Sequence, residues 1–187
     1  MRRLKRWYFQ FLRTAFYSSD SHHRVAMGAF WGFFWGLTPT VGIQITILSV
    51  QAALFYSLDK CARGKLRWLH FNLPLAIPCT MLSNPANMIP LYFAFYYVGA
   101  WLLPGYHPMG WTEFSEILKP LLTIDSLSAF KQGMANIGVH ILYPMVMGSL
   151  FIAIPAAFLS YFGVRMLLAR FNGKRKLAEA KRQKLRL

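Results

Sequence analysis

The chain has 187 residues, of which 56% are hydrophobic and 14% charged, and its 21 basic residues against 6 acidic ones give a net charge of +15. Soluble domains usually carry about 25% charged residues. Three stretches, 25–58, 68–112 and 132–164, lack Asp, Glu, Lys and Arg. Because each exceeds the roughly 20 apolar residues that cross a bilayer, the composition argues against a soluble enzyme, a disordered tail or a free nucleic-acid-binding domain.

Residues 1–24 are predicted to form an interfacial amphipathic helix followed by a short linker. Aromatic and aliphatic side chains recur there at spacings of three and four, with arginines on the other side. Such a helix lies along the membrane surface, and the alternative is a solvated helix packed on its own protein. His22 and His23 have no cysteine or carboxylate at ligand spacing, so no metal site is predicted.

The first uncharged run, 25–58, is too long for one straight membrane helix. Its 34 residues would reach about 51 Å, whereas the hydrocarbon core is about 30 Å thick. Pro39 lacks an N–H group and Gly42 is conformationally permissive, so two shorter helices are expected, over about 25–37 and 43–58.

The distribution of basic residues predicts the topology. Six Lys or Arg occur in residues 1–24, four in the loop 59–70 and nine in the tail 165–187. The positive-inside rule assigns all three blocks, and therefore both termini, to the cytoplasm. The run 25–58 is then a re-entrant hairpin, whose tip is tolerated at membrane depth only where protein or water covers its backbone. In an alternative, monotopic topology all three runs are hairpins that enter from the cytoplasm.

The predicted membrane domain spans residues 25–164, and its second part also contains an uncharged run with a break in the middle. The segment 73–106 is broken between Ser83 and Pro90, and 107–131 is an acidic outer loop with short helices near 112–119 and from about Ser126. The segment 132–164 is a transmembrane span despite Pro144 and Pro155, and 165–187 is a basic cytoplasmic tail, either helical or disordered. The predicted fold is an all-α integral membrane protein with two broken or re-entrant hairpins and at least one transmembrane helix.

Two helix N-termini inside the bilayer are the candidate functional feature. Thr40 is a candidate N-cap for a helix from Val41, and Asn84 or Asn87 for the next. Unpaired N–H groups and the helix dipole make such ends anion sites. The predicted lipid-binding residues are Thr40, Gly42, Gln44, Ser83, Asn84 and Asn87 at the breaks, with Arg24, Arg67 and His70 at the entrance; Pro39, Pro85 and Pro90 are structural breaks. Alternatively, these are kinked helices whose freed backbone groups bond to Thr, Asn and Gln side chains.

We therefore expect a non-enzymatic membrane protein that binds an anionic, phosphate-bearing lipid and moves or presents it. Phosphate-loop, zinc and nucleophile-elbow motifs are lacking, so neither catalytic residues, nor a metal, nor a cofactor is predicted. The basic tail has only Phe171 as an aromatic platform, which argues against nucleic acid. One alternative is an assembly partner of another envelope protein, or a homo-oligomer. Another alternative is an intramembrane lipid-modifying enzyme.

The order of several motifs resembles the bacterial membrane family called domain of unknown function 2062. That family has a glycine-punctuated helix, a Pro-x-x-Gly-x-Gln turn, an Arg-x-Asn loop and an Asn-Pro break before a Tyr-rich helix. The matching positions, within about 20–160, are Gly28, Gly32, Gly36, Pro39, Gly42, Gln44, Asn72, Ser83, Asn84, Pro85, Pro90, Tyr92, Tyr96 and Gly99. The loop departs from the pattern, because the arginine nearest to Asn72 is Arg67. The resemblance implies a bacterial inner-membrane protein with relatives joined to glycosyltransferase domains, which adds polyprenyl phosphate to anionic phospholipid as a candidate ligand.

Overall fold

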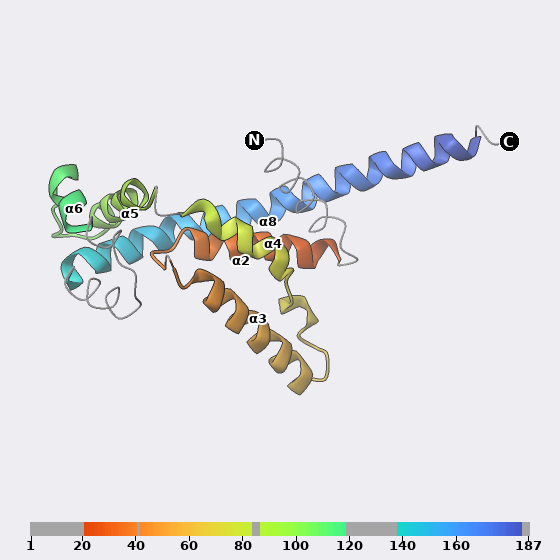
Figure 1. Ribbon diagram of the computed structural model, residues 1–187, viewed down its shortest axis with the longest axis horizontal. Helices are drawn as coiled ribbons and strands as arrows, with labels where there is room; N and C mark the ends of the chain where they lie inside the picture. The colour runs from red at the N-terminus through yellow and green to blue at the C-terminus, as the bar shows by residue number, and fades with distance from the viewer. Residues whose placement is uncertain (1–20, 41, 84–86, 119–137, 185–187) are drawn as a thin grey trace. The chain divides into compact units, whose positions relative to one another are not determined.

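The computed structural model describes residues 21–40, 42–83, 87–118 and 138–184, with side chains as far as Arg170 (Figure 1). Every regular element in these ranges is helical, which confirms the predicted all-α class. Most of the predicted interfacial helix over 1–24 lies outside the described residues, as does the second short helix predicted from about Ser126.

The helices follow the predicted order along the chain. The broken segment 73–106 contains α4, η2 and α5, and the helix predicted near 112–119 is α6. The basic tail continues the helix of the third uncharged run without interruption, so the helical alternative holds for it as far as Lys184. The elements are α2 (His22–Gly36), α3 (Gln44–Cys61), η1 (Arg67–Leu69), α4 (Leu73–Cys79), η2 (Thr80–Leu82), α5 (Met88–Leu102), α6 (Trp111–Leu118) and α8 (Val139–Lys184).

The turn between α2 and α3 lies where Pro39 and Gly42 predict it. Gly42 has a φ of 89°, in the left-handed region that glycine adopts without a steric penalty. Helix α3 begins at Gln44, later than the start at Val41 that Thr40 was expected to cap. Thr40 accepts instead from the Ile43 backbone N–H, at 3.2 Å, through its carbonyl oxygen. The Thr40 N-cap is therefore wrong, because the left-handed turn at Gly42 intervenes before the helix.

The described chain divides into two compact units, each made of segments that are distant in sequence. The first contains residues 21–32, 46–79 and the part of α8 from Ala157 onward. There α2 and α4 approach closely: a Cβ at Gly28 would lie 2.5 Å from the Asn72 carbonyl oxygen, and one at Gly32 2.5 Å from that of Ala76. Small residues of this kind allow helix backbones to pack together.

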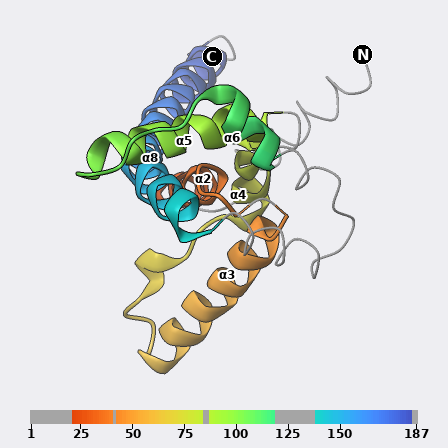
Figure 2. The ribbon, with the colours of Figure 1, turned by 90° about the vertical axis from the view of Figure 1, so that its left-hand side faces the viewer.

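The second unit contains residues 33–45, 80–118 and 138–156 of the described chain. Its core joins α5, α6 and the first part of α8 around the buried side chains of Tyr92, Phe95, Phe114 and Met145. The rings of Tyr96 and Phe114 stack at 5.2 Å, where α6 lies against α5 (Figure 2). Gly99 of α5 and Gly148 of α8 each face backbone of the opposite helix, so neither position has space for a side chain.

One stretch of the described chain is long and apolar enough to cross a membrane. It is Val139–Arg170 of α8, with 32 residues and an 18-residue window whose mean hydropathy is 1.9. Helix α5 is apolar but has only 15 residues. Pro144 and Pro155 lie inside α8 without ending it, as expected for the predicted span.

Candidate functional site

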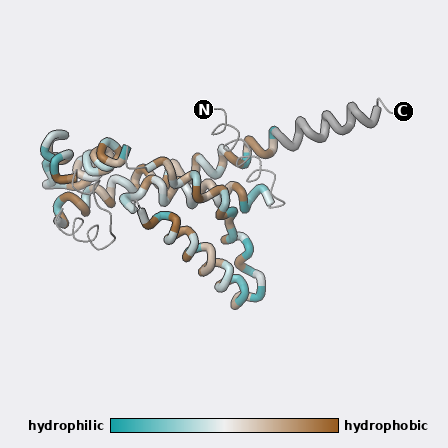
Figure 3. The backbone as a smooth tube through the Cα atoms, in the orientation of Figure 1, coloured by the Kyte–Doolittle hydropathy of each residue, from teal (hydrophilic) through white to brown (hydrophobic). Residues whose placement is uncertain are grey.

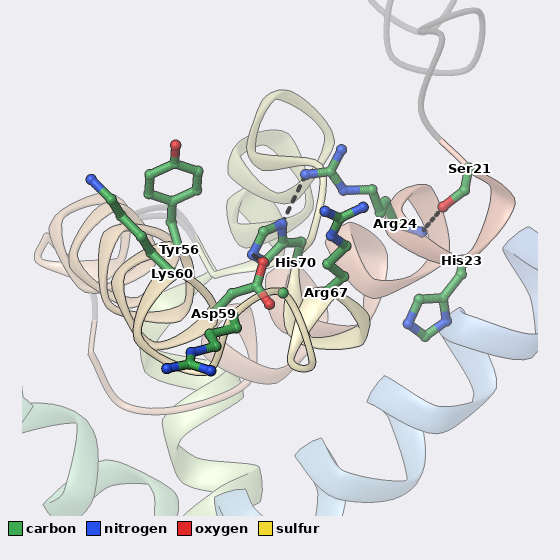
Figure 4. A pocket seen from close by; sticks show the side chains of 10 residues that line it. Ser21, His23, Arg24, Tyr56, Asp59, Lys60, Arg67 and His70 are labelled. Atoms are coloured by element: carbon green, nitrogen blue, oxygen red, sulfur yellow. Dashed lines mark hydrogen bonds and ion pairs between the residues drawn. The ribbon is translucent and has the colours of Figure 1, made fainter.

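A basic pocket of about 640 Å³ opens in the first unit, where the start of α2 meets the end of α3 and the loop after it (Figure 4). Hydrophilic residues gather at this end of α3 and along the loop (Figure 3). The pocket is lined by Ser21, His23, Arg24, Tyr56, Asp59, Lys60, Arg63, Gly64, Arg67 and His70. Three of these, Arg24, Arg67 and His70, are the residues that the sequence predicts at the entrance of an anion site.

Asp59 determines the path of the loop that forms one wall. The residue is only 8% exposed, and its Oδ1 accepts the Leu66 backbone N–H at 2.9 Å. Its carbonyl oxygen accepts the Gly64 N–H, also at 2.9 Å. The chain reverses between these contacts through Arg63 and Gly64, whose φ angles of 52° and 82° are left-handed. Asp59 thereby holds the loop in a tight turn that directs basic side chains toward the pocket.

His70 lies between a cation and a carboxylate. Arg24 Nη2 is 3.1 Å from His70 Nδ1, and His70 Nε2 is 3.4 Å from Asp59 Oδ2. A guanidinium can only donate hydrogen bonds, so Nδ1 accepts and carries no proton. Nε2 is the ring nitrogen that faces Asp59. The Nε2 contact has the distance of an ion pair but makes no hydrogen bond.

His23 is fixed by a different set of partners. Its Nε2 donates to the Trp68 carbonyl oxygen at 2.7 Å, since a carbonyl can only accept. Its Nδ1 lies 2.9 Å from the Tyr161 hydroxyl, which in turn accepts from Arg165 Nη1 at 3.3 Å. This chain of contacts joins α2, η1 and α8 within the first unit. The main role of His23 at the pocket is thus to hold the three elements together.

The pocket lining carries an excess of positive charge. Arg24, Lys60, Arg63 and Arg67 are four cations, and Asp59 is the one carboxylate among the lining residues, which leaves three positive charges before either histidine is counted. The Asp59 oxygens already face the Leu66 N–H and His70. Such a lining attracts anions, and arginine in particular matches the geometry of phosphate oxygens.

The predicted polar residues at the first break bond to one another. Gln44 Nε2 donates to the Trp35 carbonyl oxygen at 3.1 Å and to Ser83 Oγ at 2.7 Å. Thr38 and Thr40 hydroxyls donate to the same Trp35 carbonyl, at 2.9 and 3.4 Å. The last carbonyls of a helix have no partner within it, and here side chains supply partners for one of them. Gly42 is exposed, with nothing within 4 Å of a Cβ added to it.

At the second break only part of the predicted site is described. Asn87 immediately precedes α5, but its side chain does not cap the helix; its Nδ2 donates to the Leu82 carbonyl oxygen across the break. Pro90 lies in the first turn of α5, where a missing N–H costs little. Asn84 and Pro85 lie outside the described residues. The predicted residues thus form two groups, one at the pocket in the first unit and one at the breaks in the second.

Comparison with known protein families identifies the family of this chain. The family model described as "uncharacterized protein conserved in bacteria (DUF2062)" matches residues 2–176. The chain belongs to this family. The resemblance noted from its motifs is therefore confirmed. Neither the curated proteins nor the solved structures contain a match.

Several lining residues of this DUF2062 protein are not predicted as site residues from the sequence. Tyr56, Asp59 and Lys60 are spaced three and four residues apart on α3, a spacing that places side chains on one helix face. Together with the density of basic residues in 60–67, this spacing is the available signal. Metal binding finds no support among the described residues, where no group of three His, Cys, Asp or Glu side chains converges.

Proposed function

We propose that the chain is an integral protein of the bacterial inner membrane that binds the phosphate of an anionic lipid in the basic pocket and presents it at the cytoplasmic surface. The observation that carries this proposal is the pocket itself, where Arg24, Arg67 and His70 come together with Lys60 and Arg63. A volume of about 640 Å³ lies within the range of small-molecule sites, roughly 300–1,000 Å³. A phosphate with its attached glycerol or sugar suits such a space.

The surface of α8 supports membrane integration. Buried positions such as Met145, Ser149, Ala153 and Ala157 follow one face of the helix. Large apolar side chains follow the other face in an exposed stripe: Val139, Tyr143, Met147, Phe151, Ile154, Phe158, Phe162 and Met166. This stripe extends about 40 Å at 1.5 Å per residue, against a hydrocarbon core of about 30 Å. Acyl chains are the natural environment for so long an apolar face.

The first unit also supports the re-entrant topology. Arg24 precedes the hairpin 25–58 and His70 follows it, yet their side chains are hydrogen-bonded at 3.1 Å. Arg165, at the start of the basic tail, reaches the same unit through Tyr161 and His23. All three basic blocks therefore have members close together, as the positive-inside rule requires if they share the cytoplasmic side.

In this proposal the breaks have a structural role. Gln44, Ser83, Thr40 and Asn87 direct their described side-chain bonds to protein groups at the interrupted helices. This arrangement favours the alternative in which Thr, Asn and Gln satisfy the freed backbone. The phosphate is therefore assigned to the pocket, with Arg24, Arg67 and His70, and not to helix N-termini at the midplane.

Titration of the purified protein in detergent with short-chain phosphatidylglycerol, read out by native mass spectrometry, tests this function. Arg67→Gln removes a pocket cation, and Lys65→Gln removes an exposed cation of the same loop that does not line the pocket. A phosphate contact near a membrane surface is worth about 1 kcal/mol, so Arg67→Gln should weaken binding about fivefold and Lys65→Gln much less. Equal effects of the two substitutions, or equal affinity for phosphatidylcholine, would contradict the proposal.

Cysteine labelling tests the topology independently. In a background with Cys61 and Cys79 replaced by Ser, Ser57→Cys near the end of α3 should react with a membrane-impermeant maleimide only from the cytoplasmic side. Thr112→Cys in α6 should react only from the opposite side. Both positions are exposed. If Ser57→Cys reacted only from outside, the re-entrant hairpin would be wrong; if Thr112→Cys reacted from the cytoplasm, the monotopic alternative would hold.

A further inference from the structure

Three side chains form a line across the pocket: Arg24 from α2, His70 after η1, and Asp59 from α3 (Figure 4). One dashed contact in the figure joins Arg24 to His70, whose Nδ1 lies 3.1 Å from Arg24 Nη2, and His70 Nε2 faces Asp59 Oδ2 at 3.4 Å. His70 is the titratable member of the line that can bear either no charge or a positive charge near neutral pH.

The Arg24 contact and a charged His70 exclude each other. A protonated Nδ1 would direct its N–H at the guanidinium N–H, and two positive charges would meet at hydrogen-bond distance. Asp59 acts in the opposite direction, because its carboxylate favours the charged imidazole once Arg24 has moved away. The Arg24 contact at Nδ1 therefore opposes a positive charge on the His70 ring.

The surroundings of His70 add further positive charge. A positive charge on the ring is opposed by these cations while the pocket is empty, and a bound anion offsets that opposition. The titratable and charged groups that share the pocket with His70 are Arg24 and His23 from α2, Tyr56, Asp59 and Lys60 from α3, and Arg63 and Arg67 from the loop.

We propose, on the basis of the phosphate site inferred above, that a phosphate oxyanion draws Arg24 away from His70 and that the freed Nδ1 takes up one proton from solvent. The bound phosphate then faces the guanidinium of Arg24 and the imidazolium of His70, and Asp59 balances the new charge from the other side of the ring. The pocket is thus a proton-linked phosphate site, and one proton enters with each headgroup.

The linkage fixes the direction of the pH dependence. Because the complex holds one more proton than the empty protein, a fall in pH favours the complex. Across the interval in which imidazole titrates, about pH 8 to about pH 6, the affinity should rise by up to about tenfold per pH unit. A phosphodiester is the appropriate probe, since its own charge stays constant over this interval.

Isothermal titration calorimetry with dihexanoyl phosphatidylglycerol, in two buffers of different ionisation enthalpy, counts the protons directly. The wild-type chain should take up protons on binding near neutral pH, approaching one per headgroup. Inorganic phosphate forms a second arm that is read for affinity alone, because its own charge changes over this interval: much weaker binding than that of the lipid identifies the lipid as the source of the phosphate. Tighter binding of inorganic phosphate than of the lipid would overturn the lipid assignment and leave the proton linkage intact.

His70→Gln is the matched variant. A glutamine amide can accept from Arg24 through its oxygen and donate toward Asp59 through its nitrogen, but it cannot be charged. We expect no proton uptake and less than about a twofold change in affinity across the interval. His22→Gln, an exposed histidine outside the pocket lining, should retain the wild-type uptake. Should His70→Gln fail to fold, Asp59→Asn retains an acceptor for the Leu66 N–H and should reduce uptake well below one proton.

The outcomes separate the two proposals. Binding with no proton uptake in the wild-type chain overturns the linkage and leaves the lipid site standing. Undiminished uptake in His70→Gln overturns the role of His70. Absence of any binding in both arms overturns the proposed function and the linkage with it.

Discussion

The basic pocket and the first helix break show two different uses of polar side chains in one chain. In the pocket, charged groups from α2, α3 and the following loop surround an open space of about 640 Å³. At the break, Gln44 and Ser83 are 6% and 5% exposed and bond to each other at 2.7 Å. A charged side chain is costly to bury without a partner, whereas a neutral amide and a hydroxyl can satisfy each other inside protein. The charged side chains therefore line the open space in which a ligand could bind, whereas the neutral pair is buried within the protein.

The largest effect is expected from filling the close contact that holds the first unit together. A Cβ at Gly32 would lie 2.5 Å from the Ala76 carbonyl oxygen and 2.5 Å from Cys79 Cβ. Gly32→Val should destabilise the protein by about 3 kcal/mol through overpacking and also abolish headgroup binding. Gly163→Ala in α8, with nothing within 4 Å, is the control and should be neutral or slightly stabilising. Thermal unfolding in detergent measures both, and an unchanged midpoint for Gly32→Val would contradict the helix contact.

A smaller loss of stability should follow from Gln44→Ala at the break. The substitution leaves Ser83 Oγ and the Trp35 carbonyl without their amide donor, at a cost of about 1–3 kcal/mol for buried polar groups. Headgroup affinity of the folded protein should not change, because the break is assigned no ligand. A double-mutant cycle with Ser83→Ala should give a coupling of at least about 0.5 kcal/mol. Weakened lipid binding with unchanged stability would instead restore the midplane site.

Individual pocket cations should affect binding more than folding. Lys60→Gln is expected to weaken phosphatidylglycerol binding about fivefold at low salt, with an unfolding midpoint close to wild type because Lys60 is exposed. The difference between variant and wild type should shrink as salt is raised, since salt screens exposed charges. A salt-independent defect would mean that Lys60 acts through the fold and not through charge.

The smallest effect is expected at the second break. Asn87→Ala removes the side-chain bond to the Leu82 carbonyl oxygen, at a net cost of about 1 kcal/mol for a partly exposed hydrogen bond. The comparison with Asn87→Asp distinguishes this bond from capping: Asp is as favourable at an N-cap position as Asn but cannot donate to Leu82. Retained stability in Asn87→Asp would show that capping is the more important contribution.

Much of the fold could be predicted from local patterns, because each pattern acts within a few residues. Pro39 and Gly42 predict the end of α2, and the segment from Ser83 to Pro90 predicts the gap before α5. The exact start of α3 could not be predicted, since Thr40 is as good an N-cap by type as any residue there. What excludes it is the left-handed turn at Gly42, which delays the helix to Gln44, while the Thr40 hydroxyl bonds to the Trp35 carbonyl.

The sequence by itself determined the segregation of apolar and charged residues and the positions of the helices, and it predicted Arg24, Arg67 and His70 as neighbours, which the pocket brings together. Tertiary structure decided which polar groups meet. Gln44 and Ser83 are 39 residues apart, and Arg24 and His70 are 46 apart, yet each pair is hydrogen-bonded. Helix formation depends on neighbours along the chain, whereas these pairs depend on the path of α3 and of the loop that Asp59 holds. The path of the chain therefore decides that the Gln44 amide bonds within the protein and that the basic side chains of the loop line the pocket.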